Sequence, residues 1–242
     1  MIRSISAEWL KLRHSRIGLL LAVLPVVSLL IGCANYYANQ GVLGNGWYSL
    51  WTQVSLFYGE FFLPILIAIC CSYLARLEHV NRNWNMTMSS PVSPASVFFA
   101  KWFVAGLLIL FAQILFVLLY WLAGNLLALE GGFPPETVGW IMRGWHASLA
   151  IGALQLALSL KMRSFATPIG ICLCAVFAGL GFYVAKLALF FPFSLLTIGM
   201  GVLSQNKLEG FQHVMFWVSS TGFILLFAAM SISRLKRKDI VS

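Results

Sequence analysis

Six long apolar runs constrain this chain more than any other feature of its sequence. They cover residues 17–37, 54–74, 99–127, 140–160, 165–185 and 211–232. Each run has the roughly 20 predominantly apolar residues that one membrane-spanning helix needs. Only 10% of the residues are charged, against about 25% in soluble domains, so the chain cannot cover itself with a polar surface. We therefore predict an all-α integral membrane protein with six transmembrane helices, forming a single transmembrane domain over residues 1–242.

The basic residues indicate how these spans are oriented. Lysine and arginine gather at the cytoplasmic ends of spans, and 13 of the 16 in this chain fall on one side of the expected topology. They are Arg3, Lys11, Arg13, Arg16, Arg76, Arg82, Lys101, Lys161, Arg163, Arg234, Lys236, Arg237 and Lys238. We therefore expect that side, with both termini, to lie in the cytoplasm.

A seventh apolar stretch, residues 187–203, is interrupted by Pro192, Gly199 and Gly201. If it spanned the membrane, the basic C-terminal tail would lie outside the cell. We therefore expect residues 186–210 to form an extracellular re-entrant or interfacial hairpin. Irregular backbone at membrane depth must be covered by protein or reached by water. The hairpin is therefore expected to pack against other spans or a partner subunit. The alternative is a short apolar loop resting on the outer interface.

The N-terminal segment, residues 1–16, has an amphipathic pattern. Trp9 and Leu12 share its apolar face, and Lys11 and Arg13 lie off that face. Basic amphipathic helices lie flat on the inner membrane surface. We expect an interface helix here; a plain positively charged flank is the alternative.

The loop between the second and third spans, residues 75–98, begins with a second amphipathic stretch. Leu77, Val80, Trp84 and Met88 recur at helical spacing, and a Ser-Ser-Pro-Val-Ser-Pro turn follows. A simple connection could be short and wholly polar. This loop is instead expected to present a small helix to a cytoplasmic partner; a surface helix without a partner is the alternative.

Several polar or aromatic residues within or near the spans could line a substrate groove, because polar groups cost free energy in a membrane and often mark function. Glu60 could face such a groove, pair with Arg143 or lie at headgroup level. The amides could hydrogen-bond between helices, and the aromatic residues could form an interfacial belt. The candidate groove residues are Glu60, Gln113, Asn125, Arg143, Trp51 and Tyr58.

No catalytic, metal or nucleic-acid motif is found in the sequence. It contains no HExxH, GxSxG or P-loop pattern, and its five cysteines all fall within apolar runs without metal-ligand spacing. The chain is therefore not expected to be an enzyme or to bind a cofactor or metal. Energy for any active process would have to come from another polypeptide.

The chain resembles the ABC-2 type of ABC exporter permease. The resemblance is carried by Ser6-Ala7-Glu8-Trp9-Leu10-Lys11-Leu12-Arg13, by the six spans, by the loop Glu78…Trp84…Ser90-Pro91-Val92-Ser93…Lys101-Trp102, and by the apolar Pro-Phe hairpin. Within the family, the small size and this loop are most similar to lantibiotic-protection permeases of the bacterial plasma membrane.

The resemblance implies partners and roles. A cytoplasmic ATPase dimer would bind ATP and Mg²⁺, and a second permease subunit, identical or paralogous, would pair with this chain. Residues 77–88 would be a coupling helix. Its apolar face would hold Leu77 and Trp84 as anchors, together with Val80 and Met88. Glu78 and Arg82 would lie in a polar rim around that face. The substrate would be an amphipathic lanthionine peptide removed from membrane lipid. Another hydrophobic compound, such as a bacitracin-like peptide or a lipid, and a non-transporting toxin-binding scaffold are the alternatives.

Overall fold

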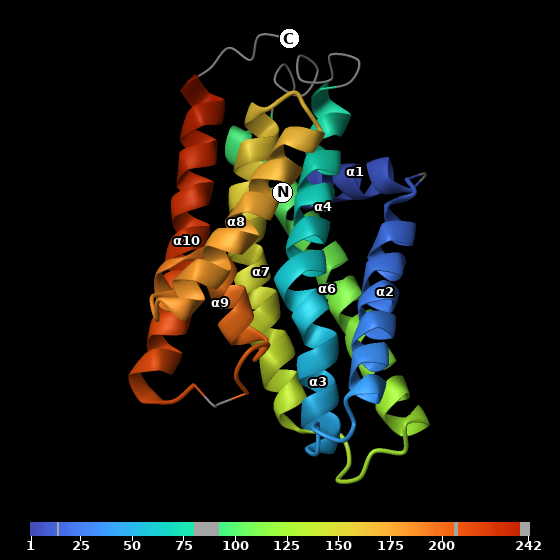
Figure 1. Ribbon diagram of the computed structural model, residues 1–242. Coiled ribbons are helices and arrows are strands. Elements are labelled where there is room, and N and C mark those ends of the chain that lie inside the picture. Colours follow the sequence, from blue (N-terminus) through green and yellow to red (C-terminus); the bar gives the residue numbers. More distant parts are fainter. Residues whose placement is uncertain (14, 80–91, 206–207, 238–242) are drawn as a thin grey trace.

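The computed structural model describes residues 1–13, 15–79, 92–205 and 208–237, and this part of the chain is helical without strands. In Figure 1 the long helices run side by side as a bundle, and the short α1 lies across it. The elements are α1 (Ile2–Leu12), α2 (Ile17–Ala38), α3 (Gly46–Phe57), η1 (Tyr58–Phe62), α4 (Leu63–His79), α6 (Pro94–Leu126), α7 (Glu136–Lys161), α8 (Ala166–Val184), η3 (Ala188–Phe190), α9 (Pro192–Gly199) and α10 (Gly210–Arg237).

Within the described residues, five helices are long and apolar enough to cross a membrane. They are α2, the continuous α3–η1–α4, α6, α8 and α10. The remaining expected span, residues 140–160, falls in α7, whose 26 residues are also enough to span but are less apolar. Because α7 packs against α4, α6, α9 and α10, much of its surface meets protein rather than lipid. That α7 is a sixth span stays a prediction.

The second expected span is part of a much longer helix. The segment Gly46–His79 has 34 residues, or about 50 Å at 1.5 Å per residue. A π-helical turn, Tyr58–Phe62, interrupts it just before Pro64. Proline has no N–H and its ring clashes with the carbonyl four residues earlier, here that of Glu60. Widening to a π-turn accommodates this carbonyl and places Glu60 within the widened turn.

The third span begins earlier than the apolar pattern predicts. The helix α6 starts at Pro94, inside the expected loop, because the Ser93 hydroxyl accepts a hydrogen bond from the Ser96 backbone N–H at 3.2 Å and Pro94 occupies the first turn. The 33 residues of α6 span about 50 Å, longer than the roughly 30 Å hydrocarbon core. A helix of this length must tilt in the membrane or project beyond the apolar layer.

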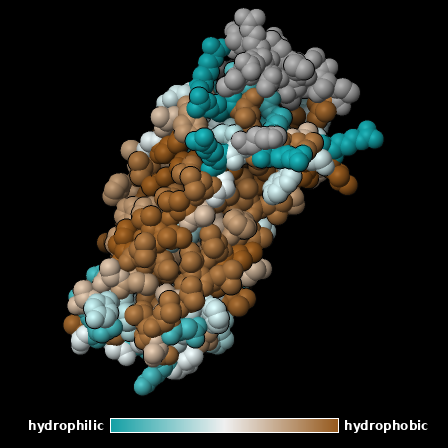
Figure 2. Space-filling view, turned by 90° about the vertical axis from the view of Figure 1, so that its right-hand side faces the viewer, coloured by the Kyte–Doolittle hydropathy of each residue, from teal (hydrophilic) through white to brown (hydrophobic). Residues whose placement is uncertain are grey.

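The helix ends that carry most of the basic residues are expected to lie together at one end of the bundle. Figure 1 places the last turns of α10 and α4 at the same end as the connection from α7 to α8, with α1 towards that end. The turns from α2 to α3 and from α6 to α7 lie at the other end. Figure 2 shows one face of the molecule, where a broad hydrophobic band separates two hydrophilic ends. The described helix ends that are expected in the cytoplasm thus share one end of the bundle; which side of the membrane this end faces stays a prediction.

Small residues allow α2 to pack closely on α3. A Cβ added at Gly32 would lie 2.5 Å from the Val54 Cα, and the Ser28 hydroxyl donates to the Val54 carbonyl at 2.9 Å. Contacts between small residues are a common way for helices to associate in lipid. The other face of α2 is exposed, with Leu19 and Leu30 each more than 60% accessible.

The expected hairpin between α8 and α10 contains the short helix α9, which is largely buried. Of its eight residues, all but Ile198 are buried, and α9 contacts α7, α8, α10 and η1. The indole of Trp51 donates to the Met200 carbonyl at 3.0 Å, which satisfies one carbonyl at the end of α9. This segment is therefore part of the protein core, and its re-entrant character stays a prediction.

Candidate functional site

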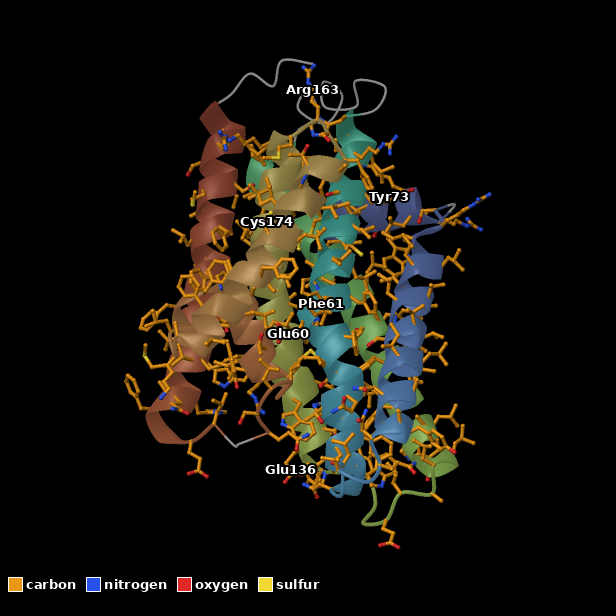
Figure 3. The ribbon with its side chains drawn as sticks, viewed as in Figure 1. Glu60, Phe61, Tyr73, Glu136, Arg163 and Cys174 are labelled. Atoms are coloured by element: carbon orange, nitrogen blue, oxygen red, sulfur yellow. The ribbon has the colours of Figure 1, made fainter. Side chains whose placement is uncertain are left out.

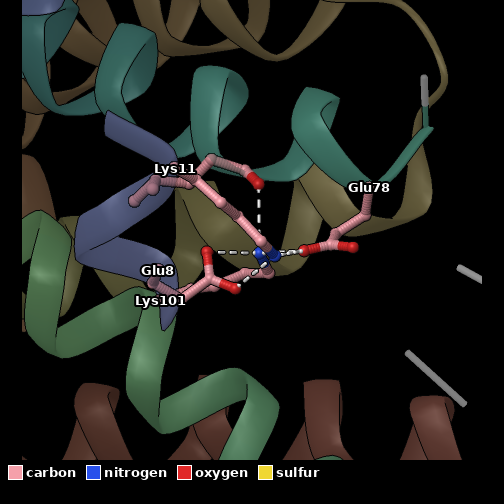
Figure 4. A network of polar contacts seen from close by, with 5 residues as sticks. Glu8, Lys11, Glu78 and Lys101 are labelled. Carbon is pink, nitrogen blue, oxygen red and sulfur yellow. Dashed lines mark hydrogen bonds and ion pairs between the residues drawn. The ribbon is translucent and has the colours of Figure 1, made fainter. Parts of the chain in front are cut away.

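Four charged residues from three helices form a buried network at the end of α4. Figure 4 shows Glu8 and Lys11 from α1, Glu78 from the end of α4, and Lys101 from α6. The Lys101 ammonium lies 2.7 Å from a Glu8 carboxylate oxygen and 2.8 Å from Glu78 Oε1. It also donates to the Leu74 carbonyl at 3.2 Å. The Lys11 ammonium reaches Glu8 at 2.9 Å and also binds Glu78.

Two acids and two lysines make this charged cluster (Glu8, Lys11, Glu78 and Lys101) electrically balanced. The side chain of Lys101 is 0% exposed and that of Glu78 is 1% exposed, whereas Lys11 remains 34% exposed. Burying a charge is costly unless it is paired and hydrogen-bonded. Removing one partner would leave an uncompensated buried charge, so the four residues depend on one another and tie α1, α4 and α6 together.

The half-exposed Lys11 lies outside the membrane-spanning helices. Burial by itself lowers the pKa of its ammonium, but hydrogen bonds to Glu78 and Glu8 outweigh this effect. The pKa of Lys11 is therefore raised above the ordinary value of 10.5. Lys11 stays charged throughout the physiological range and contributes to the charged cluster there.

The structure changes the expected role of Glu78. It was expected in an exposed polar rim facing an ATPase, but it is buried and bound to Lys11 and Lys101. The reason is tertiary: α1 packs against α6, and Lys11 of α1 and Lys101 of α6 both reach the end of α4. Leu77 lies in the last turn of α4. The other expected coupling residues, Val80, Arg82, Trp84 and Met88, lie outside the described residues.

The expected interface residues of α1 divide into two groups. Trp9 is 53% exposed, and Arg13 is exposed at the C-terminal cap of α1. Lys11 instead turns towards the charged cluster. Because α1 contacts α6, it is anchored to the bundle by these ion pairs as well as by any contact with lipid.

Glu60 lies in a second polar region, deep in the bundle. Figure 3 shows it about midway between the end that carries Arg163 and the end that carries Glu136. It is 4% exposed, its Oε1 has no hydrogen-bond partner among the described residues, and Thr197 of α9 lies within hydrogen-bond reach of the carboxylate. A buried carboxylate with an unpartnered oxygen is costly, which marks this position as a candidate functional one.

Gln113 of α6 and Tyr58 of η1 add further unpartnered polar atoms to the interior. Both amide atoms of Gln113 and the hydroxyl of Tyr58 lack hydrogen-bond partners in the described part of the chain. The Tyr58 ring stacks on Phe116 at 3.9 Å between centroids. A Cβ added at Gly144 would lie 3.5 Å from the Gln113 amide nitrogen and 2.5 Å from Met200. We call these residues (Tyr58, Glu60, Gln113 and Thr197) the interior polar region: Tyr58 and Gln113 lie by α6 and α7, and Glu60 lies by α9.

Other expected groove residues are placed differently. Trp51 is 0% exposed and stacks on Trp140 at 4.9 Å, so Trp51 and Tyr58 are core residues and form neither an interfacial belt nor an open groove. Asn125 is exposed near the end of α6, where it donates to the Trp121 carbonyl at 2.7 Å. It lies about 18 Å along the helix from Gln113. Asn125 and Gln113 therefore do not belong to one site.

The structure shows no ion pair between Glu60 and Arg143, both of which are described. All the ion pairs found within the described residues belong to the charged cluster. Arg143 lies on α7, and its Nε has no hydrogen-bond partner among those residues. Helix rotation decides this outcome, because a pattern of spans gives no information about which faces of two helices meet.

Sequence reasoning also missed the link between Glu8 and Lys101, although signals for it were present. Glu8 and Lys11 are three residues apart on a helix, the spacing at which side chains interact. Lys101 stands inside an apolar run, where a charged residue usually has a partner. The pairing itself needs the position of α1, which the local pattern does not supply.

These features define a multi-pass helical membrane protein with a charged junction at one end and a polar region in its interior. Its family follows from comparison with known proteins: the chain belongs to the ABC-2 transporter family, because the family model described as ABC-2 family transporter protein matches residues 4–179. The match extends from α1 into α8 and includes the charged cluster and, of the interior polar region, Tyr58, Glu60 and Gln113. The comparison with curated proteins found no match. The protein is thus a membrane transport subunit of the ABC-2 type.

Proposed function

We propose that this chain is the membrane subunit of an ATP-driven exporter that removes an amphipathic antimicrobial peptide, of the lantibiotic type, from the bacterial plasma membrane. A cytoplasmic ATPase dimer binds ATP and Mg²⁺, and a second permease subunit completes the transporter. The chain itself contributes the path and the mechanical coupling, without catalysis.

The charged cluster is the observation that carries this proposal. Glu78 stands two residues before the loop segment 80–91, which is expected to contact the ATPase, and it is bound to Lys101 of α6 and Lys11 of α1. A displacement of the end of α4 would move both partners, because separating a buried ion pair is costly. The cluster thus supports a mechanism in which α1, α4 and α6 respond together to the ATPase.

The packing of the interior supports a substrate that stays at the membrane surface of the subunit. Large aromatic side chains, among them Trp51, Trp140 and Phe116, fill the centre of the bundle. The outward faces of α2 and α6 carry exposed apolar residues, including Leu30 and Phe111. An amphipathic peptide already inserted in the bilayer could meet such a face, or the junction between two subunits, without an aqueous pore through one chain.

The test begins with co-expression of the full chain and its genomic neighbours, followed by purification in mild detergent and mass spectrometry. An ATPase and a second permease are expected to co-purify, and cells expressing the set are expected to tolerate a pore-forming lanthionine peptide. Purification of the chain alone, without nucleotide hydrolysis, would contradict the exporter and favour a toxin-binding scaffold. A bound ATPase without peptide protection would reject the substrate and favour export of another hydrophobic compound.

Coupling through the loop is tested with Trp84→Ala. The exposed Trp121 near the C-terminal end of α6 offers a matched control, Trp121→Ala. We expect Trp84→Ala to insert normally but to lose protection by about tenfold or more, as truncation of an interface anchor does. Equal protection by both variants would reject the coupling role of Trp84.

A further inference from the structure

A cavity of about 410 Å³ lies in the angle between α1, α2 and α6, away from the interior polar region. Its size is within the range of small-molecule sites. Its floor is formed by Leu12, Ile17, Leu21 and Leu108, all of which are buried. An apolar floor of this kind suits a hydrocarbon chain.

The mouth of the cavity carries a cationic and a polar group. Arg13 is exposed there and forms no ion pair with any residue that the structure describes. The Ser15 hydroxyl is buried and has no hydrogen-bond partner in the same part of the chain. Both belong to the segment from α1 to α2, which is expected at the inner surface of the membrane. The occupant that complements this arrangement has an anionic oxygen-rich head and an apolar tail.

The cavity is open at Gly18 in the first turn of α2. A Cβ added at this glycine would meet no atom within 4 Å. Nearby, the exposed faces of Trp9 and Leu10 continue the apolar lining outwards. A ligand can therefore enter laterally from the bilayer.

We propose that this cavity binds one anionic phospholipid of the inner leaflet, with an acyl chain on the floor and the phosphate beside Arg13 and Ser15. Anionic inner-leaflet lipids are attracted to basic segments, and an arginine–phosphate contact is strong and directional. The lipid would fill the angle between α1 and α2 and so hold α1 against the bundle. This binding is independent of the transported substrate.

The test uses the full chain in nanodiscs of phosphatidylcholine and phosphatidylglycerol, released into the gas phase for native mass spectrometry. Phosphatidylglycerol is expected to be retained in preference to phosphatidylcholine. Arg13→Gln is expected to reduce its retention about tenfold, as for loss of one hydrogen bond to a charged group. The control Arg3→Gln removes the same charge from an exposed position on α1, outside the cavity lining, and is expected to retain the lipid.

A second pair of variants tests the cavity itself. Gly18→Phe places a ring at the open mouth and is expected to abolish retention, whereas Gly222→Phe, at another helical glycine with open space around it, is expected to preserve it. Equal retention in Arg13→Gln and Arg3→Gln, or equal retention of the two lipids by the wild type, would overturn the proposal. If Gly18→Phe fails to fold, the arginine pair decides the result by itself.

Discussion

The two polar regions of this molecule differ in how completely their groups are satisfied. In the charged cluster, Lys101 has three partners, two carboxylates and a backbone carbonyl. In the interior polar region, Glu60, Gln113 and Tyr58 each have a buried polar atom without a partner among the described residues. A satisfied buried network makes its surroundings rigid, whereas unsatisfied groups are costly and are retained where a function needs them. The charged cluster is therefore expected to add to stability, whereas the unpartnered groups of the interior polar region are expected to lower it.

The largest expected effect comes from breaking the charged cluster at its centre. Lys101→Met should lower the free energy of unfolding by about 3–5 kcal/mol, because it leaves Glu8 and Glu78 buried with only Lys11 to compensate them. The thermal midpoint of the detergent-purified protein, followed by size-exclusion chromatography after heating, measures this effect. Lys236→Met, at an exposed position on α10, is the control and should change little. Similar midpoints for the two variants would show that the cluster does not hold the helices together.

The same substitution in the two regions should have opposite effects on stability. Glu78→Gln removes a charge that binds two lysines and should lower the free energy of unfolding by about 1–3 kcal/mol. Glu60→Gln removes a buried charge with an unpartnered oxygen and should leave that free energy unchanged or raise it by up to about 2 kcal/mol. Thermal midpoints of both proteins, measured side by side, provide the comparison.

Activity sharpens this comparison further. If Glu60 takes part in transport, Glu60→Gln should reduce protection of cells while its stability is maintained. A destabilised Glu60→Gln protein would instead show that Glu60 has a structural partner and that the two regions are alike.

The smallest expected effect is a dependence on alkaline pH. Because the pKa of Lys11 is raised by folding, its contribution to stability is complete below the unfolded-state pKa of about 10.4 and is lost as pH rises through the higher folded value. The difference in thermal midpoint between wild type and Lys11→Met should therefore be constant from about pH 6 to 9 and narrow above about pH 10. A difference that stays constant beyond that point would contradict the ion pairs of Lys11. Lys236→Met provides the reference for other lysines.

Much of the architecture could be predicted from local patterns. Apolar run length and glycine or proline interruptions placed the long helices, since twenty apolar residues in a row have few alternatives to a span. The ends were less predictable. The helix α6 begins after the Ser93 cap rather than at the first apolar residue. The second span begins earlier than predicted, because α3 continues into η1 and α4 as one helix. Helical hydrogen bonding can continue through polar residues beyond an apolar run.

The sequence by itself determined that this protein is a helical membrane protein of the ABC-2 type, with its basic segments at one end, because hydrophobicity and charge act locally along the chain. The tertiary structure decided which polar groups meet. It paired Glu78 with Lys101 rather than exposing it, kept Glu60 apart from Arg143, and buried Trp51 in the core. These outcomes depend on how each helix rotates and where α1 crosses the bundle. Those geometries are set by contacts between residues far apart in the chain, such as Trp51 and Met200, which are 149 positions apart, and no local pattern records such contacts.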